Sequence, residues 1–271
     1  MVVSSAMSGV TNNLIKKSKN LSKDFDLAEL DVLVSSGEQM ACALIAGRLK
    51  SLDYKSRSWM SWQIPIISEG NHSSARIIEI KKNNIKRYLK LGGIPIITGF
   101  QGLNANHRVT TLGRGGSDAS AIMIAKFFKA ERCVIYTDVI GVMTTDPRIY
   151  KKAKKIKIIS YEEMLEMSSL GSKVMQSSSV QDARLNRINV DVKSSFIKKE
   201  GTLITKRKNI INNKIITGIS STKSDAKVTL VGVKDKPGIA ASIFKPLSEN
   251  NINVDMVVQN ISADGKETDL T

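Results

Sequence analysis

At the centre of the chain stands Leu112-Gly113-Arg114-Gly115-Gly116-Ser117-Asp118, and further along comes Tyr136-Thr137-Asp138. Between these segments, residues 119–130 have a helical pattern and residues 133–136 form a short apolar run typical of a strand. A glycine-rich turn that opens a helix presents free backbone N–H groups and the positive end of the helix dipole to an anion. A capped helix is the simpler interpretation of a lone glycine turn. The added arginine, whose guanidinium suits phosphate or carboxylate, favours an anion site here.

Size and composition indicate a globular protein with one large and one small domain. The chain has 271 residues, of which 41% are hydrophobic and 24% charged. No apolar run approaches the ~20 residues of a membrane span, and residues 1–4 lack the features of a signal peptide. Cys42 and Cys133 have no metal-ligand spacing and are interpreted as reduced core thiols. We therefore expect a cytoplasmic protein without a membrane partner.

The net charge of +16 raises the question of nucleic-acid binding. The lysines are scattered along the chain in short clusters only, and aromatic residues, which stack on single-stranded bases, make up just 5%. Anionic substrates would also favour a positive site. The sequence therefore predicts small anionic ligands and no nucleic-acid partner.

Apolar runs alternate with helical patterns, which predicts an α/β fold. Helices are expected over residues 14–19, 27–49, 83–91, 117–130, 161–168 and 174–186, and strands at 2–3, 64–67, 94–98, 133–137 and 190–192. A second unit follows, with strands at 227–233 and 252–258 around a helix that Asp235 could cap. We assign residues 1–210 to a catalytic domain and residues 215–271 to a small βαβ unit.

The motifs resemble those of aspartate kinases, in the family's order along nearly the whole chain. Residues 110–121 resemble the nucleotide and substrate loop, and residues 136–148 resemble the adenine and ribose segment. Shorter matches lie at residues 5–11, 35–38, 99–102 and 171–174. The fold implied is the three-layer α/β sandwich of the amino-acid kinases, followed by a partial ACT unit. A generic βαβ packing unit is the alternative for the second part.

The resemblance implies phosphorylation of the β-carboxylate of L-aspartate by ATP with Mg²⁺, the first step of lysine, threonine and methionine biosynthesis. A carboxylate is already ionised at pH 7, so this reaction needs cations and N–H donors rather than a general base. His72 and His107 are accordingly not expected to act in catalysis, and no set of metal-ligating side chains is predicted.

The resemblance also assigns roles to individual residues. Arg114 and Asp118 are the expected catalytic residues. Substrate binding is expected of Ser5, Thr11, Glu38, Arg114 and Ser117, and nucleotide binding of Ser117, Thr137, Asp138, Arg148 and Lys173. Ser5 and Thr11 could equally be turn and cap residues, Glu38 an exposed helix acid, and Lys173 a surface lysine. The ACT resemblance implies an effector site for lysine or threonine at Asp235, Asn253, Asp255 and Gln259, and homo-oligomers formed through ACT units.

Aspartate kinases begin with a strand and a Lys-Phe-Gly-Gly turn before the segment that matches residues 5–11, and the ACT resemblance here covers one unit only. We therefore expect this chain to be cut at both ends and to have little kinase activity by itself. An inactive regulatory or amino-acid-binding fragment, or a kinase of another carboxylate such as glutamate or N-acetylglutamate, are the alternative functions.

Overall fold

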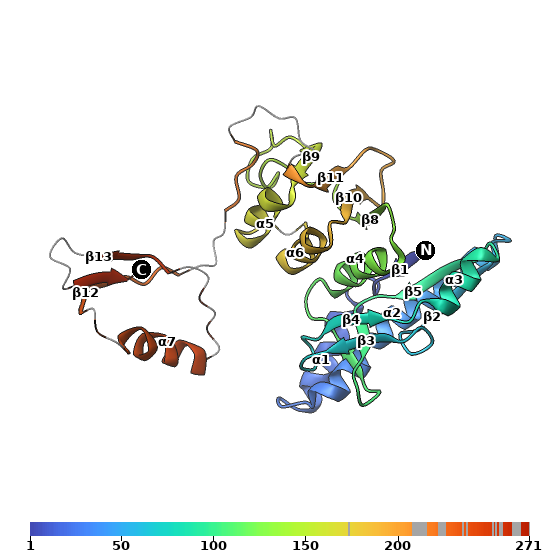
Figure 1. Cartoon of the computed structure of the whole chain (residues 1–271), viewed down its shortest axis with the longest axis horizontal. Coiled ribbons are helices and arrows are strands. Elements are labelled where there is room, and N and C mark those ends of the chain that lie inside the picture. The colour runs from blue at the N-terminus through green and yellow to red at the C-terminus, as the bar shows by residue number, and fades with distance from the viewer. Residues whose placement is uncertain are drawn as a thin grey trace. The chain divides into compact units, whose positions relative to one another are not determined.

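The computed structural model describes residues 1–172, 174–207, 216–221, 226–234, 236, 238–250, 252, 254, 257–261 and 267–270. The chain forms two compact units, Met1–Ser221 and Thr222–Thr271 (Figure 1). The described part contains no helix that is both long enough and apolar enough to cross a membrane.

The first unit has an α/β fold, as the sequence predicts. Its helices are α1 (Val10–Leu21), α2 (Leu27–Lys50), α3 (Asn83–Lys90), α4 (Gly116–Phe128), α5 (Tyr161–Ser169) and α6 (Ser177–Asn186). Its strands are β1 (Val2–Ser4), β2 (Ser56–Trp59), β3 (Ile66–Glu69), β4 (Arg76–Ile80), β5 (Ile94–Thr98), β6 (Gln101–Leu103), β7 (Val109–Thr111), β8 (Arg132–Thr137), β9 (Ile158–Ser160), β10 (Asn189–Ser194) and β11 (Thr202–Thr205).

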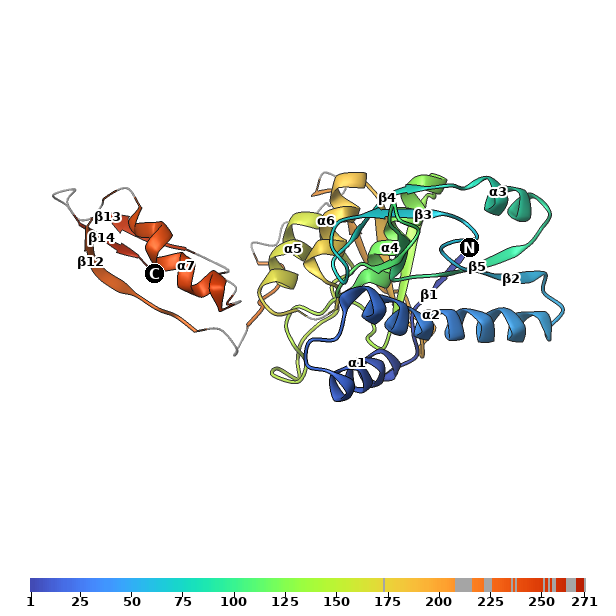
Figure 2. The same cartoon turned by 90° about the horizontal axis from the view of Figure 1, so that it is seen from below.

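The strands of this unit form three sheets. The first is parallel, in the order β1-β5-β2, and α2 contacts all three of its strands (Figure 2). The second has the order β4-β3-β6-β7, in which β6 and β7 form an antiparallel pair. The third has the order β8-β10-β11-β9, with β8 and β10 parallel. The apolar residues of β5, Ile94–Thr98, fit the middle of a sheet that is covered by helices.

Helix α4 connects these sheets. It contacts β1 of the first sheet, β4 and β6 of the second, and β8 of the third. Ile122 and Ala125 belong to the core cluster around β8 and β10, whereas Met123 and Ile124 belong to the cluster around Trp59 and β5. A helix that is apolar on opposite faces must be buried on both, so the helix that follows the glycine-rich loop is held firmly in place.

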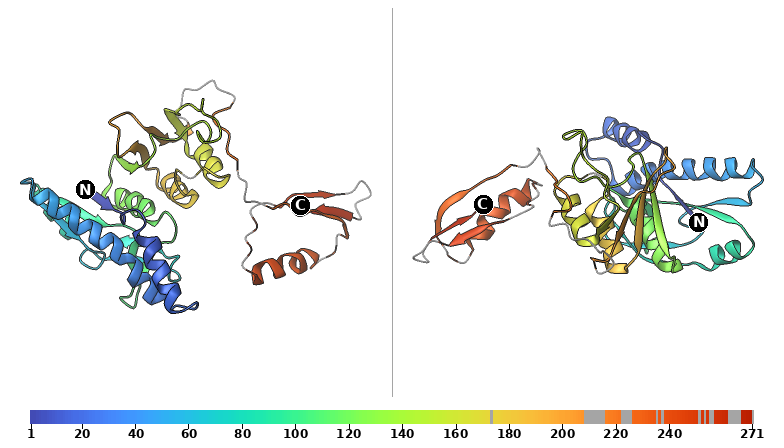
Figure 3. Two further views of the ribbon diagram at one scale, coloured as in Figure 1. Left: turned by 180° about the vertical axis from the view of Figure 1, so that it is seen from behind. Right: turned by 90° about the horizontal axis from the view of Figure 1, so that it is seen from above.

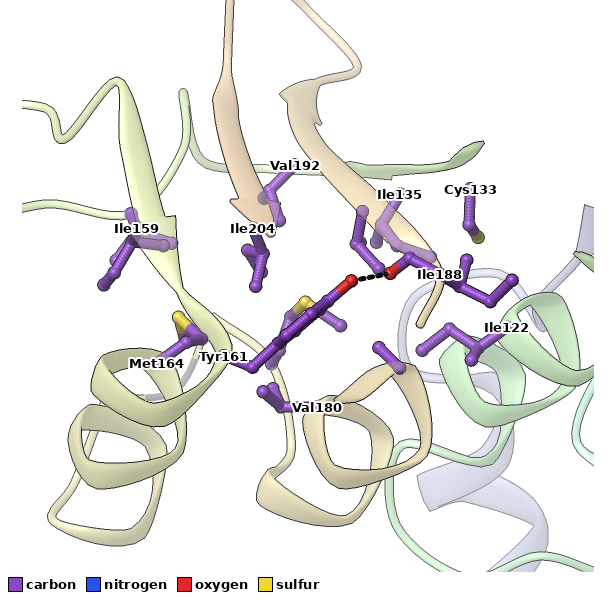
Figure 4. Close-up of a cluster of buried hydrophobic side chains, with 14 of the residues drawn as sticks. Ile122, Cys133, Ile135, Ile159, Tyr161, Met164, Val180, Ile188, Val192 and Ile204 are labelled. Carbon is purple, nitrogen blue, oxygen red and sulfur yellow. Dashed lines mark hydrogen bonds between the residues drawn. The ribbon is translucent and has the colours of Figure 1, made fainter. Parts of the chain in front are cut away.

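Tyr161, at the start of α5, packs in the core around the third sheet. Its ring is almost fully buried, and its hydroxyl donates a hydrogen bond to the carbonyl of Ile188 at 2.7 Å (Figure 4). The helix begins with a capping box between Ser160 and Glu163. The aromatic ring is thereby buried while its polar group remains paired.

The second unit comprises β12 (Leu230–Lys234), α7 (Ile239–Glu249), β13 (Gln259–Ile261) and β14 (Glu267–Leu270), drawn in orange to red in Figure 3. Its strands form an antiparallel sheet in the order β12-β14-β13. The strand expected over residues 252–258 is wrong for the described residues of that range, none of which is in a strand. Among the described residues, pairing with β14 begins at Gln259, directly after the expected range. The capping role expected for Asp235 lies outside the described residues.

Candidate active site

Helix α2 approaches the residues after β1 so closely that a side chain larger than that of glycine at one position would crowd its neighbours. A Cβ atom at Gly37 would lie 3.0 Å from the Ala6 Cβ and 3.1 Å from Val10 Cγ1. This close approach brings the next residue of α2, Glu38, to the backbone of the loop, where its Oε1 accepts a hydrogen bond from the Ala6 N–H at 3.0 Å. The pair Gly37-Glu38 therefore joins α2 to the residues that follow β1.

Glu38 is only 2% exposed, and its Oε2 atom has no hydrogen-bond partner among the described residues. Burial raises the pKa of this carboxyl from 4.5 to about 7, although the Ala6 N–H lowers it in part. A buried carboxylate with an unpaired oxygen is unfavourable by itself and would be stabilised by a cationic ligand. The interpretation of Glu38 as an exposed helix acid is therefore wrong.

The glycine-rich loop leads from β7 into α4 and meets the end of β1. Gly115 is the N-cap of α4, with φ of 71°, and no side chain in the described part of the chain caps this helix end. Ser117 instead donates its hydroxyl hydrogen bond to Ser5 Oγ at 3.1 Å. Phe100, in the turn after β5, donates its N–H to Ser120 Oγ at 2.9 Å. The first turn of α4 thus lies beside Ser5, with its uncapped N–H groups suited to an anion.

Asp118 lies in this first turn, and burial raises its pKa from 3.8 to about 6. Its charge in turn contributes to raising the pKa of the buried Cys133 thiol to about 12, after the larger effect of that thiol's own burial. Like Glu38, Asp118 would be stabilised by a cation. No group of three or more His, Cys, Asp or Glu side chains among the described residues is arranged to hold a metal by itself.

The remaining expected residues lie in loops or near the ends of helices and strands. Arg114 is exposed in the glycine-rich loop, and Thr11 is the second residue of α1. Thr137, the last residue of β8, donates to Asp138 Oδ1 at 3.1 Å. Arg148 forms an ion pair with Asp146 at 2.7 Å, which keeps its guanidinium beside its own loop.

Two protein families match this chain. The model of the amino acid kinase family matches residues 1–194, and that of the ACT domain matches residues 227–271. The chain belongs to the amino acid kinase family. It is 44% identical over its whole length to an aspartate kinase of Stutzerimonas stutzeri and 43% identical to an aspartokinase of Helicobacter pylori. It spans 66% and 67% of the lengths of these two relatives.

Solved structures agree on the kind of amino acid kinase. E. coli aspartokinase III in complex with aspartate and ADP has a TM-score of 0.70 and 26% identity, over 96% of this chain and 59% of that one. The same enzyme in complex with lysine and aspartate has a TM-score of 0.67. The expected fold class, an amino-acid-kinase fold followed by an ACT unit, is confirmed, as is the resemblance to aspartate kinases.

Several residues expected to act in this amino acid kinase lie outside the described residues, namely Lys173, Asp235, Asn253 and Asp255. Gln259, the fourth residue of the expected effector site, is the first residue of β13.

Polar residues that hold the site together were not predicted from the sequence. Gln101, fully buried in β6, donates to the backbone carbonyl of Ser35 in α2 at 3.3 Å. Asp31 of α2 is fully buried among donors from two other segments. A polar residue on the apolar face of a predicted helix was the available signal, since such a residue needs a partner when buried.

Proposed function

We propose that this protein transfers the γ-phosphoryl group of ATP to the β-carboxylate of L-aspartate. The observation that carries the proposal is the buried Glu38 carboxylate, one oxygen of which has no partner in the described part of the chain, beside the Ser5–Ser117 contact and the start of α4, which no described side chain caps. A group of this kind suits the ammonium group of an amino acid. The aspartate bound to E. coli aspartokinase III supports the choice of substrate.

The site can serve the reaction without a general base. In our proposal, Glu38 holds the substrate's ammonium group, Arg114 holds its α-carboxylate, and Ser5 and Thr11 lie beside the substrate. The substrate's β-carboxylate is already ionised and acts as the nucleophile. A bond forms between this carboxylate and the γ-phosphorus while the bond to ADP breaks, and the N–H groups at the start of α4, with Ser117, donate hydrogen bonds that stabilise charge on the transferring group.

The nucleotide would lie toward the end of β8, where Thr137 and Asp138 follow one another; Arg148 and Lys173 complete the proposed nucleotide contacts. The ADP bound to E. coli aspartokinase III supports this part. Mg²⁺ in phosphoryl transfer neutralises charge on the phosphates and is commonly held by one or two carboxylates together with those phosphates. Asp118 fits such a role by its place in the first turn of α4, beside the N–H groups proposed for the phosphates, where a cation would favour its charged form.

Isothermal titration calorimetry tests the substrate directly, with L-aspartate, L-glutamate and N-acetylglutamate as ligands. We expect L-aspartate alone to bind, and Glu38→Gln and Arg114→Ala each to lower its affinity by about tenfold or more, since each removes a charge-assisted hydrogen bond. His107→Ala, in the exposed loop before β7, is the matched control and should leave the affinity unchanged. Preference for glutamate or N-acetylglutamate would indicate another carboxylate kinase of this fold.

Binding without catalysis would point to the alternative of an amino-acid-binding protein. An ATP- and Mg²⁺-dependent hydroxamate assay with aspartate separates the two, run on a version extended at its N-terminus by the strand and Lys-Phe-Gly-Gly turn of aspartate kinases, because we expect little turnover from the 271-residue chain by itself. In that assay, Asp118→Asn should reduce turnover far more than His107→Ala, because charge stabilisation rather than proton abstraction carries the reaction. Equal damage by both variants would contradict the mechanism.

The second unit supplies regulation in this proposal. The lysine bound to E. coli aspartokinase III in its T-state supports lysine as an effector, with threonine as the alternative. Among the described strands, β12 and β13 each pair on one side only, and such edges favour pairing with a second ACT unit. Sedimentation should therefore show at least a dimer, and Gln259→Ala should weaken binding of the effector.

A further inference from the structure

Asp31 lies seven residues before Glu38 on α2, so both side chains project from the same face of the helix, two turns apart. Asp31 is fully buried. It takes no part in the proposed reaction, and its carboxylate is surrounded by donors of the protein itself.

Those donors come from two segments distant in the sequence. Thr111, the last residue of β7, donates its hydroxyl to Asp31 Oδ1 at 2.5 Å. Ser73 donates its N–H at 3.0 Å to Oδ2 and its hydroxyl at 3.0 Å to Oδ1. His72 donates from Nδ1 to Oδ2 at 2.7 Å. A buried carboxylate with this many donors is fully satisfied and fixes the groups around it.

The two segments are also bonded to each other and to the glycine-rich loop. Ala75 donates its N–H to the Thr111 carbonyl at 3.0 Å. A Cβ atom at Gly113 would lie 3.2 Å from the Ser73 carbonyl oxygen, and the φ of Gly113 is +73°. The loop that carries Arg114 therefore starts from Thr111 and passes closely over Ser73, both of which Asp31 holds.

We infer that Asp31 is a positioning residue for the amino-acid substrate. Through Thr111 and Ser73 it fixes the place of the Arg114 loop relative to α2, and hence the separation between Arg114 and Glu38. This inference rests on the proposed function, in which those two side chains hold opposite charges of one small molecule. An amino acid has a fixed distance between its ammonium and carboxylate groups, so a displacement of about 1 Å weakens one contact or the other.

The test compares two acids of α2 that both bond to the segment before the glycine-rich loop. Asp31→Asn keeps the shape of the side chain but replaces one acceptor oxygen by an NH₂ group that faces donors. Glu29→Gln is the matched control, because Glu29 pairs with Arg108 at 2.6 Å on the exposed side of the same helix. Calorimetry with L-aspartate and with a non-hydrolysable ATP analogue, and hydrogen–deuterium exchange of the full chain, are measured for both.

For Asp31→Asn we expect about a tenfold loss of aspartate affinity, an affinity for the ATP analogue within about twofold of wild type, and faster exchange over residues 70–75 and 110–116. Glu29→Gln should leave all three unchanged. If Asp31→Asn does not fold, Ser73→Ala and Thr111→Val each remove one hydroxyl donor and should show the same pattern at about two- to threefold.

Two results would overturn the inference. One is a folded Asp31→Asn variant with wild-type aspartate affinity; the other is a loss of affinity with unchanged exchange over residues 110–116. A wild-type chain that does not bind aspartate would instead overturn the proposed function and, with it, the substrate that Asp31 is inferred to serve. The exchange measurement would still show in that case whether Asp31 orders the Arg114 loop.

Discussion

Asp31 and Glu38 are two buried carboxylates on one face of one helix, and they differ in how fully they are bonded. Asp31 is 0% exposed and accepts hydrogen bonds from His72, Ser73 and Thr111. Glu38 is 2% exposed, accepts one bond from the Ala6 N–H, and has an unpaired oxygen among the described residues. Burial is thus nearly the same in the two cases, and the carboxylates differ in bonding: Asp31 is fully bonded, whereas Glu38 keeps one oxygen unpaired among the described residues.

The largest expected difference concerns stability. Asp31→Ala leaves the donors of Ser73, Thr111 and His72 without their acceptor, which should lower the free energy of unfolding by about 3–5 kcal/mol. Glu38→Ala removes an acceptor from the Ala6 N–H alone and should lower it by less than half as much. Urea unfolding at pH 5, where native Glu38 holds its proton, measures both. Equal losses would mean that the bonding of these carboxylates does not distinguish their roles.

The second prediction uses the pH dependence of stability. Because burial raises the Glu38 pKa to about 7, from 4.5, the native state holds this proton more tightly than the unfolded chain. Its contribution to stability is therefore full below pH 4.5 and is lost as the pH rises through 7. Glu38→Gln has no proton to lose, so its stability relative to wild type should increase between pH 4.5 and pH 8, by about 2–3 kcal/mol.

Urea unfolding of both proteins at pH 5, 6.5 and 8 measures this change, with Glu29→Gln as the control for an exposed acid of the same helix. A constant difference between Glu38→Gln and wild type across that range would show that Glu38 titrates normally.

The sequence predicted the local part of this arrangement well. The long helix was expected over residues 27–49 and runs from Leu27 to Lys50, and the strand expected at 94–98 is β5. Both elements carry their signal in neighbouring residues, as an apolar run or a periodic face. Short strands such as β6 and β7, which contain Gly102 and Thr110, have no such periodicity and were missed.

The candidate site likewise has one part that carries a local sequence signal and one part that does not. Glu38 and the glycine-rich loop could be singled out because short motifs carry them. The structure shows that Glu38 is buried rather than exposed, and the binding roles of both stay predictions. The Asp31 cluster was missed because its bonds to Ser73 and Thr111 join residues 42 and 80 positions apart. No local pattern shows which distant hydroxyl will meet a buried carboxylate, so this part required the fold.

The third prediction concerns proton release on binding. With a pKa of about 7, Glu38 is about half protonated at pH 7, whereas the ammonium group of a bound amino acid favours its charged form. Binding of aspartate at pH 7 should therefore release about half a proton, and binding at pH 8.5 almost none. Calorimetry in buffers of different ionisation enthalpy measures the number. Binding without proton release at pH 7 would mean that Glu38 does not bind the ammonium group.

The smallest effect is expected for Glu29, the exposed acid of α2. Its side chain is 57% exposed and pairs at 2.6 Å with Arg108, whose side chain is 45% exposed. Ion pairs in water gain little, because water screens the charges and the side chains lose freedom. Glu29→Gln should therefore leave urea unfolding unchanged within error, in low salt and in 0.5 M NaCl alike (about a 4–5 Å screening length). A loss of stability close to that of Asp31→Ala would contradict this comparison. It would mean that contact with the segment before the glycine-rich loop is enough for an acid of α2 to stabilise the fold, whether or not the acid is buried and fully bonded.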